Sequence, residues 1–238
     1  YVIAFRDEAH PLLEGANTSE NVATFTITDT GPGIDEDGIT FLTDNRGSGV
    51  KAYYVTDKPR SVEDPTKNES LWNELPVPQH SINVDYEITS TNPIFVWSKD
   101  ECGNVGYIAE GETTAHPGEP AVFQPTKVRV EDADGNPIKE YYVIGDKPII
   151  VLPPDDEVPD HPQDPENNKF SGWVSPTPGG GTVDVTPGTE SGTDKPVKPD
   201  GDHTIVIRPN YSTDMAKIVY LGNGGDVVTP SGSVASYD

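Results

Sequence analysis

Hydrophobic and polar residues alternate along several short segments of this chain. In residues 22–28, Ala23, Phe25 and Ile27 fall on one side of an extended backbone, and three threonines fall on the other. Residues 82–88 show the same period of two, with four apolar side chains separated by polar ones. Because successive side chains of a strand point to opposite faces, both segments predict strands with one buried and one solvated face.

Two further segments, 50–55 and 94–97, are denser in apolar residues. They predict either central strands covered on both faces or strands that leave an aromatic side chain exposed. Glycine-containing turns separate the runs. Helical periodicity is nearly absent, although residues 61–75 have room for one short turn around Leu71 and Trp72. The pattern therefore predicts an all-β chain.

Composition divides the chain into two strand-rich parts. A polar, proline-bearing stretch begins near residue 111, and we assign residues 114–125 as a linker. Two polar inserts interrupt the second part, the acidic 153–169 and the Gly- and Pro-rich 175–202, and both predict surface loops without a core. The predicted strands of the second part are 127–131, 138–144, 148–152, 170–174 and 204–208.

The chain also contains an internal similarity. Residues 4–9 (AFRDEA) match the chemistry of residues 97–102 (WSKDEC), which suggests tandem modules. Residues 1–16 are then either the last strand of a preceding repeat or the first strand of the module that follows. We expect a piece of a longer protein. Its predicted parts are residues 1–16, a first module at 17–113, the linker 114–125, a second module at 126–214 and the start of a further repeat at 215–238.

Charge and composition exclude several classes of function. The 238 residues include 40 Asp and Glu but only 16 Lys and Arg, which gives a formal net charge of −24. This charge repels phosphate backbones, so we expect no nucleic-acid partner. No apolar run reaches the length of about 18 residues needed for a transmembrane helix, so we expect no membrane insertion. The single cysteine, Cys102, excludes an intrachain disulfide and a cysteine zinc cluster.

The most specific pattern of the first module lies at residues 99–105 (KDECGNV), and it follows SGVKAYY at 48–54 and a single tryptophan, Trp72. These residues resemble the bacterial immunoglobulin-like repeats of large surface proteins. The resemblance implies an immunoglobulin-like β-sandwich in residues 17–113. Cys102 stands where those repeats usually have alanine, and a buried free cysteine would behave there as a small hydrophobe.

The second module carries FSGW at residues 170–173, together with VRV at 128–130, DGN at 134–136 and TIVIRPNY at 204–211. It resembles the Listeria–Bacteroides repeat, which is also the B repeat of internalins. The resemblance implies a β-grasp-like module whose small core contains Phe170 and Trp173, with Gly172 allowing a close backbone approach. Known members have a short helix between strands, but the proline-rich 153–169 is a poor helix, so the topology stays open.

We therefore expect an all-β fold, namely an immunoglobulin-like β-sandwich plus a second small β-rich, β-grasp-like module. The resemblances imply non-catalytic structural and adhesive modules of an extracellular bacterial cell-surface repeat protein. The partners would be host or matrix proteins or glycans, and neighbouring modules of the same chain. The alternative is a carbohydrate-binding accessory module of a secreted glycan-degrading enzyme. Solvent-exposed aromatic residues would favour that alternative, whereas Trp72, Trp97 and Trp173 occupy positions typical of a core.

No catalytic residue is indicated. The histidines lie mostly in loop-like sequence, and neither a Gly-x-Ser-x-Gly nor a His-Glu-x-x-His segment occurs. Forty acidic residues make some pair of carboxylates unavoidable, so such a pair would not identify a glycosidase. We expect neither catalytic residues nor a cofactor. An intramolecular isopeptide bond, as found in some surface β-modules, would need a buried lysine, for which Lys51 is the candidate.

Calcium is the one metal that the sequence leaves open. Asp132, Asp134 and Asn136 place oxygen ligands around Gly135, as calcium-binding loops do. The same residues also form an ordinary hairpin turn, and no suitably spaced glutamate follows as an EF-hand requires. A second acidic cluster lies at residues 35–37.

Overall fold

The computed structural model describes residues 9–29, 48–145, 149–154, 157–158, 160, 168–177, 180–191 and 197–213, and four two-residue strands. The described residues are almost entirely strands and turns, which confirms the all-β fold class. Their one named helical element is the 3-10 turn η1 (Glu69–Leu71), at the position where the sequence predicted a short turn. Among these residues, no helix is long and apolar enough to cross a membrane.

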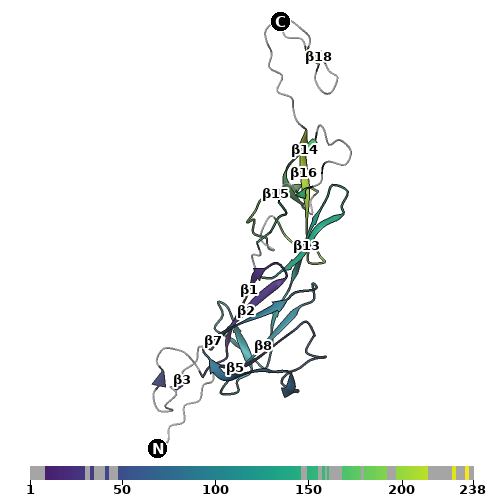
Figure 1. The fold of residues 1–238 in the computed structure, drawn as a ribbon. Helices are drawn as coiled ribbons and strands as arrows, with labels where there is room; N and C mark the ends of the chain where they lie inside the picture. The colour runs from purple at the N-terminus through teal and green to yellow at the C-terminus, as the bar shows by residue number, and fades with distance from the viewer. Residues whose placement is uncertain are drawn as a thin grey trace, which may run out of the picture.

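Two facing sheets form the first module (Figure 1). Within them β1 lies parallel to β9, and the other strand pairs are antiparallel. The first sheet has the order β10 (Ala115–Pro117), β9 (Gly106–Ala109), β1 (Leu12–Ser19), β2 (Val22–Thr28), β7 (Ser81–Glu87). The second has the order β11 (Ala121–Phe123), β8 (Ile94–Asp100), β5 (Val50–Thr56), β6 (Asn73–Gln79). The predicted β-sandwich is confirmed.

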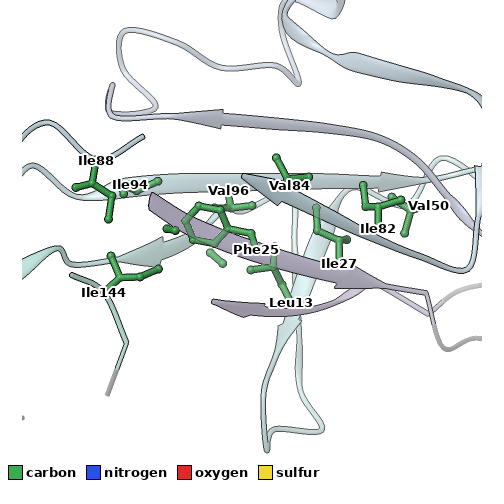
Figure 2. Packing of buried hydrophobic residues seen from close by; sticks show 12 residues of the cluster. Leu13, Phe25, Ile27, Val50, Ile82, Val84, Ile88, Ile94, Val96 and Ile144 are labelled. Carbon is green, nitrogen blue, oxygen red and sulfur yellow. The ribbon is translucent and has the colours of Figure 1, made fainter. Parts of the chain in front are cut away.

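The core of the sandwich lies between the inner faces of these sheets. Ala23, Phe25 and Ile27 are fully buried, and Ile82 and Val84 of β7 face the same core, so the predicted alternation is confirmed. Figure 2 shows the aromatic ring of Phe25, on β2, surrounded by aliphatic side chains from neighbouring strands. Such burial contributes about 1.5–3 kcal/mol for each large apolar side chain, and it is the main stabilising term of a module this small.

The predicted linker is wrong over most of its length. Residues 115–117 form β10 and residues 121–123 form β11, which close one edge of each sheet. Ala121 is buried in the core, and the ring of Phe123 lies 4.9 Å from that of Phe25. These two apolar side chains draw the segment onto the sandwich, although its prolines are typical of a linker. The connection between the strands of the two modules is therefore only Gln124 and Pro125.

The first strand of the sandwich is also longer than the predicted boundary allows. β1 begins at Leu12 and pairs with both β2 and β9, so residues 12–16 belong to this module. The alternative of a first strand therefore holds for them. Residues 4–8, the first half of the similarity with 97–102, lie outside the described residues, as does most of the further repeat at 215–238.

The second module is a single five-stranded sheet in the order β13 (Pro137–Val143), β12 (Thr126–Glu131), β16 (Thr204–Thr213), β14 (Asn168–Pro176), β15 (Thr182–Val185). β12 and β16 are parallel, and the other pairs are antiparallel. Numbered within the module, the order is 2-1-5-3-4 with the first and last strands parallel and central, which is the arrangement of a β-grasp sheet. The remaining strands have two residues each and form two antiparallel pairs. These pairs are β3 (Gly33–Ile34) with β4 (Phe41–Leu42), and β17 (Val227–Val228) with β18 (Val234–Ala235).

The described residues between β13 and β14 contain no α-helix, and most of the proline-rich 153–169 lies outside the described residues. Residues 149–152 instead lie along the core. The hydroxyl of Tyr141 donates to the carbonyl of Val151 at 3.0 Å and accepts from its N–H at 2.7 Å. Burial raises the pKa of Tyr141, so the phenol stays neutral and can make both hydrogen bonds. Of the predicted strand 148–152, the described residues 149–152 form a single bridge, between Ile149 and Glu190.

The prediction that the 175–202 insert lacks core residues is wrong. Within it, β15 pairs with β14, and the side chains of Val185 and Val197 are buried in the core of the second module. Alternation places Val183 and Val185 on one face of this short strand, and that is enough to dock a Gly- and Pro-rich segment. Phe170 and Trp173 form the predicted aromatic core pair, with ring centroids 5.3 Å apart.

Gly172 has a different role from the predicted one. A Cβ built on this residue would meet no atom within 4 Å, so no backbone approaches closely. Its φ is +145°, and the register of β14 against β16 shifts between Phe170 and Gly172. Glycine is thus required by the backbone conformation of a β-bulge, since other residues rarely adopt this φ.

We expect Gly172→Ala to lower the free energy of unfolding of the second module by about 1–3 kcal/mol, because alanine is strained at this φ. Gly201→Ala is the matched control, because Gly201 also has open space around it but lacks a positive φ. That control should leave stability unchanged or slightly raised. Urea titrations followed by NMR signals of β14 and β16 measure both. Equal effects of the two substitutions would refute the conformational explanation.

Candidate functional site

The two modules meet at a joint, where the β1–β2 turn contacts strand β13. Asn21 lies in this turn with a φ of 62°, a left-handed conformation that asparagine tolerates better than most residues. Its N–H donates to the carbonyl of Tyr142 at 3.1 Å, and its Oδ1 accepts the N–H of Tyr142 at 2.8 Å. The turn therefore pairs with the edge of β13 in the manner of a neighbouring strand.

The same asparagine is also anchored in its own module. Its carbonyl accepts the N–H of Ile88 at 2.7 Å, at the point where β7 has just ended. Three hydrogen bonds thus fix one residue between the sandwich and the second module. Each neutral hydrogen bond of this type contributes about 0.5–1.5 kcal/mol net, and orphaning a buried partner costs more.

Apolar contacts reinforce this pairing. Ile144, which follows the last residue of β13, is 2% exposed and belongs to the core cluster of the sandwich. Figure 2 shows Ile144 at the same end of that cluster as Ile88 and Ile94. Tyr142 is partly buried against the same cluster. Burial of one isoleucine side chain is worth about 1.5–3 kcal/mol, so this contact is the largest single contribution to the joint.

An ion pair lies beside the turn. Lys139 Nζ is 2.7 Å from Glu20 Oε1, and each side chain is about a third exposed. An ion pair this accessible contributes little, about 0–1 kcal/mol, since water and salt screen it. It favours one alignment of the modules without determining their stability.

The covalent connection is equally constrained. Only Gln124 and Pro125 separate β11 from β12. The side-chain amide of Gln124 donates to the carbonyl of Thr91 at 2.6 Å, and the pyrrolidine ring of Pro125 restricts its φ. Such a tether cannot act as a flexible hinge of the Gly/Ser type.

The structure brings the predicted calcium ligands together in the β12–β13 turn. Asp132 Oδ1 accepts the N–H groups of Asp134 at 2.9 Å and Asn136 at 2.7 Å, and Oδ2 accepts the Asn136 side-chain amide at 3.0 Å. These hydrogen bonds, the one from the Asn136 side chain first, lower the pKa of Asp132. The carboxylate serves the turn itself, and calcium binding here stays a prediction.

The other candidate metal ligands do not form a site within the described part of the chain. Among the described residues, no group of three or more His, Cys, Asp or Glu side chains is placed to hold a metal ion. The acidic cluster at 35–37 lies outside the described residues. His116 pairs with Glu112 at 3.1 Å and stacks on Tyr107 at the edge of the first sheet.

The three tryptophans are buried, as their positions predicted. Trp72 and Trp97 pack with Ala52 on the outer face of the second sheet, and Trp173 lies in the core of the second module. Lys99 Nζ lies 4.8 Å from the ring centre of Trp72, and the Arg60 guanidinium lies 5.4 Å from that of Trp97. Both faces of β5 and β8 are therefore covered, so the apolar segments 50–55 and 94–97 form central strands covered on both faces.

Asp64 holds the segment that covers Trp97. Burial by itself would raise the pKa of this carboxyl group, but hydrogen bonds from Thr66, Arg60 and Lys67 outweigh burial and hold the pKa well below its usual range. The carboxylate therefore stays ionised in acidic solution and keeps its partners. Arg60 Nε and Lys67 Nζ lie 3.0 and 3.1 Å from Asp64 Oδ2.

Two expectations about single residues are wrong. Cys102 is exposed, because it lies in the turn after β8 and not in the core. Lys51 is not a buried lysine of the kind that isopeptide chemistry needs. Its side chain is 28% exposed, and Nζ pairs with Glu101 at 3.3 Å.

The residues of the joint were not identified from the sequence. An asparagine between two predicted strands signals a turn, but nothing in the local pattern indicates its partner, 121 residues away. Comparisons with protein-family models, curated proteins and solved structures found no match to this chain.

We expect Asn21→Gly to weaken the joint by about 1 kcal/mol, because glycine keeps the positive φ but removes the acceptor of the Tyr142 N–H. Hydrogen exchange at the Tyr142 amide should accelerate about fivefold, which is the same energy expressed as a rate. Asn21→Asp is the matched control, since it keeps a side-chain oxygen at this position. Tyr142 exchange that is unchanged in the glycine variant would contradict this role of Asn21.

Proposed function

We propose that this chain forms non-catalytic structural modules of an extracellular repeat protein at a bacterial cell surface. The modules act there as a rigid spacer, and their exposed faces contribute to adhesion. The observation that carries the proposal is the fixed head-to-tail joint, because a stiff connection between successive modules is what a spacer requires.

The strand directions support a spacer. β1 runs from Leu12, at the end of the sandwich remote from the joint, to the turn that contains Asn21. β12 starts beside the joint, where Thr126 pairs with Val143, and runs away from it. Because β16 is parallel to β12, the last strand also leads away from the joint. The described chain thus enters at one end and leaves at the other, and Figure 1 shows the sheets following each other along one axis.

The same topology suits a chain under tension. In the second module, the first and last strands are central neighbours and parallel, and they pair at four register positions from Lys127–Thr204 to Val130–Ile207. A force that pulls the start of β12 and the end of β16 in opposite directions acts along both strands. It therefore loads these hydrogen bonds together in shear, and not one after another. A module built in this way resists extension more than one whose end strands can be peeled off singly.

Surface charge supports an extracellular, extended setting. The net charge of −24 keeps exposed modules soluble and makes neighbouring copies repel one another. The resemblances of residues 99–105 and 170–173 to surface-protein repeats point to the same setting. On this proposal the partners are host or matrix proteins or glycans, and neighbouring modules of the same chain.

The carbohydrate-binding alternative draws little support from the described residues. All three tryptophans are at most 7% exposed, so they form no platform on which a sugar ring could stack. A glycan array tests this alternative. A carbohydrate-binding module should bind one glycan class selectively, and an array without a ligand above background would disfavour it.

Location tests the proposal directly. An antibody raised against the two modules should label intact cells of the organism that makes the protein as strongly as permeabilised cells. An antibody against a cytoplasmic protein, which should label permeabilised cells only, is the control. Labelling that appears only after permeabilisation would overturn the proposal.

A further inference from the structure

We infer that strand β13 is shared between the two cores, and that the first module depends on the folded second module for part of its own stability. This inference goes beyond the proposed function, since it concerns folding and holds wherever the protein is located. It rests on the end of β13, where neighbouring side chains point into different modules.

The alternation at this strand end is regular. Tyr141 and Val143 are buried in the core of the second module, at 1% and 3% exposure. Tyr142, which lies between these two residues, and Ile144, which follows them, pack against the core of the first module. Successive side chains of an extended chain point to opposite faces, so one strand end supplies both cores.

This arrangement makes the position of Ile144 conditional. β13 is held in its extended course by six register pairs with β12, from Thr126–Val143 to Glu131–Pro137. Tyr141 and Val143 fix the rotation of the strand by filling the second core. If the second module unfolds, nothing in its sheet presents Ile144 and Tyr142 to the sandwich, and the sandwich loses two apolar neighbours.

Under tension, the two modules therefore open in a defined order. Opening of the second module withdraws Ile144 from the first core, so the first module becomes easier to open once its neighbour has yielded. Conversely, while β13 stays paired, it stabilises both modules. The joint therefore transmits stability between units that a two-residue tether alone would leave independent.

Site-resolved hydrogen exchange on the full chain tests this dependence. In Ile144→Ala, the core amides of the first module, such as those of Phe25 and Val96, should exchange at least tenfold faster than in the unsubstituted chain. Ile149→Ala is the matched control, because Ile149 follows β13 by a few residues but is 59% exposed. Its exchange in the first module should stay within twofold of the unsubstituted chain.

A double-mutant cycle separates dependence from simple packing. Trp173→Asp places a charge in the second core and unfolds that module. It should also accelerate exchange in the first module at least tenfold, and adding Ile144→Ala should then change that exchange by less than twofold. Loss of all protection in both modules on Trp173→Asp alone would be the extreme form of the same dependence.

Two results would overturn the inference. One is unchanged exchange of the first module in Ile144→Ala. The other is an Ile144→Ala effect of the same size with and without Trp173→Asp, since Ile144 would then not need the second module. If Ile144→Ala fails to fold, Ile144→Val gives the graded measurement, with a smaller acceleration of the same amides expected. Neither exchange measurement depends on where the protein is located. Failure of this inference and failure of the proposed function are therefore distinguishable.

Discussion

The pairing of Asn21 with Tyr142 is the constraint on which the arrangement of the two modules depends. It converts the edge of a sheet in one module into a docking line for a turn of the other, through two hydrogen bonds made by a single residue in a left-handed conformation. Because the peptide groups of Tyr142 leave little freedom for sliding or rotation, the turn defines both distance and orientation. Ile144 then adds apolar burial at a position that this pairing has already aligned.

The strand directions and strand order of both modules bring the residues of the joint together. The sandwich must present the β1–β2 turn at its far end, so its first strand runs its full length toward the neighbour. The second module must present the edge of β13, which its strand order places outside β12. The short Gln124–Pro125 connection brings β12 to the same place. Head-to-tail order, parallel end strands and an acidic composition are the features on which the proposed role as a repeated spacer rests.

Local features of the fold were predictable because burial on a strand has a period of two. The alternating residues of 22–28 and 82–88 indicated the right faces, and the tryptophans occupy cores as expected. Very short strands were not predictable. β11 offers three residues and β15 four, both next to glycine or proline, so their alternation is too brief to outweigh composition. Only the tertiary contacts of Phe123 and Val185 show that these segments are structural.

The joint was beyond prediction for a different physical reason. Tyr142 takes part through its backbone N–H and carbonyl, which every residue has, so nothing in its side chain marks the pairing. Asn21 contributes its own N–H and its side-chain Oδ1, but an asparagine in a turn does not indicate which distant strand it meets. Ile144 reads as one more apolar residue of a strand, and nothing local indicates that it faces a different core from Val143. The predicted linker misled for a related reason, since prolines indicate a chain that is not helical but not whether it is docked.

Residual dipolar couplings measured on the full chain in a weakly aligning medium test the central claim most directly. The rigid joint predicts that couplings from the sandwich and from the β13–β12–β16–β14–β15 sheet fit one common alignment tensor, with the same magnitude and orientation in both modules. Two tensors of different magnitude, as independently tumbling modules give, would contradict a rigid joint and with it the spacer built upon it.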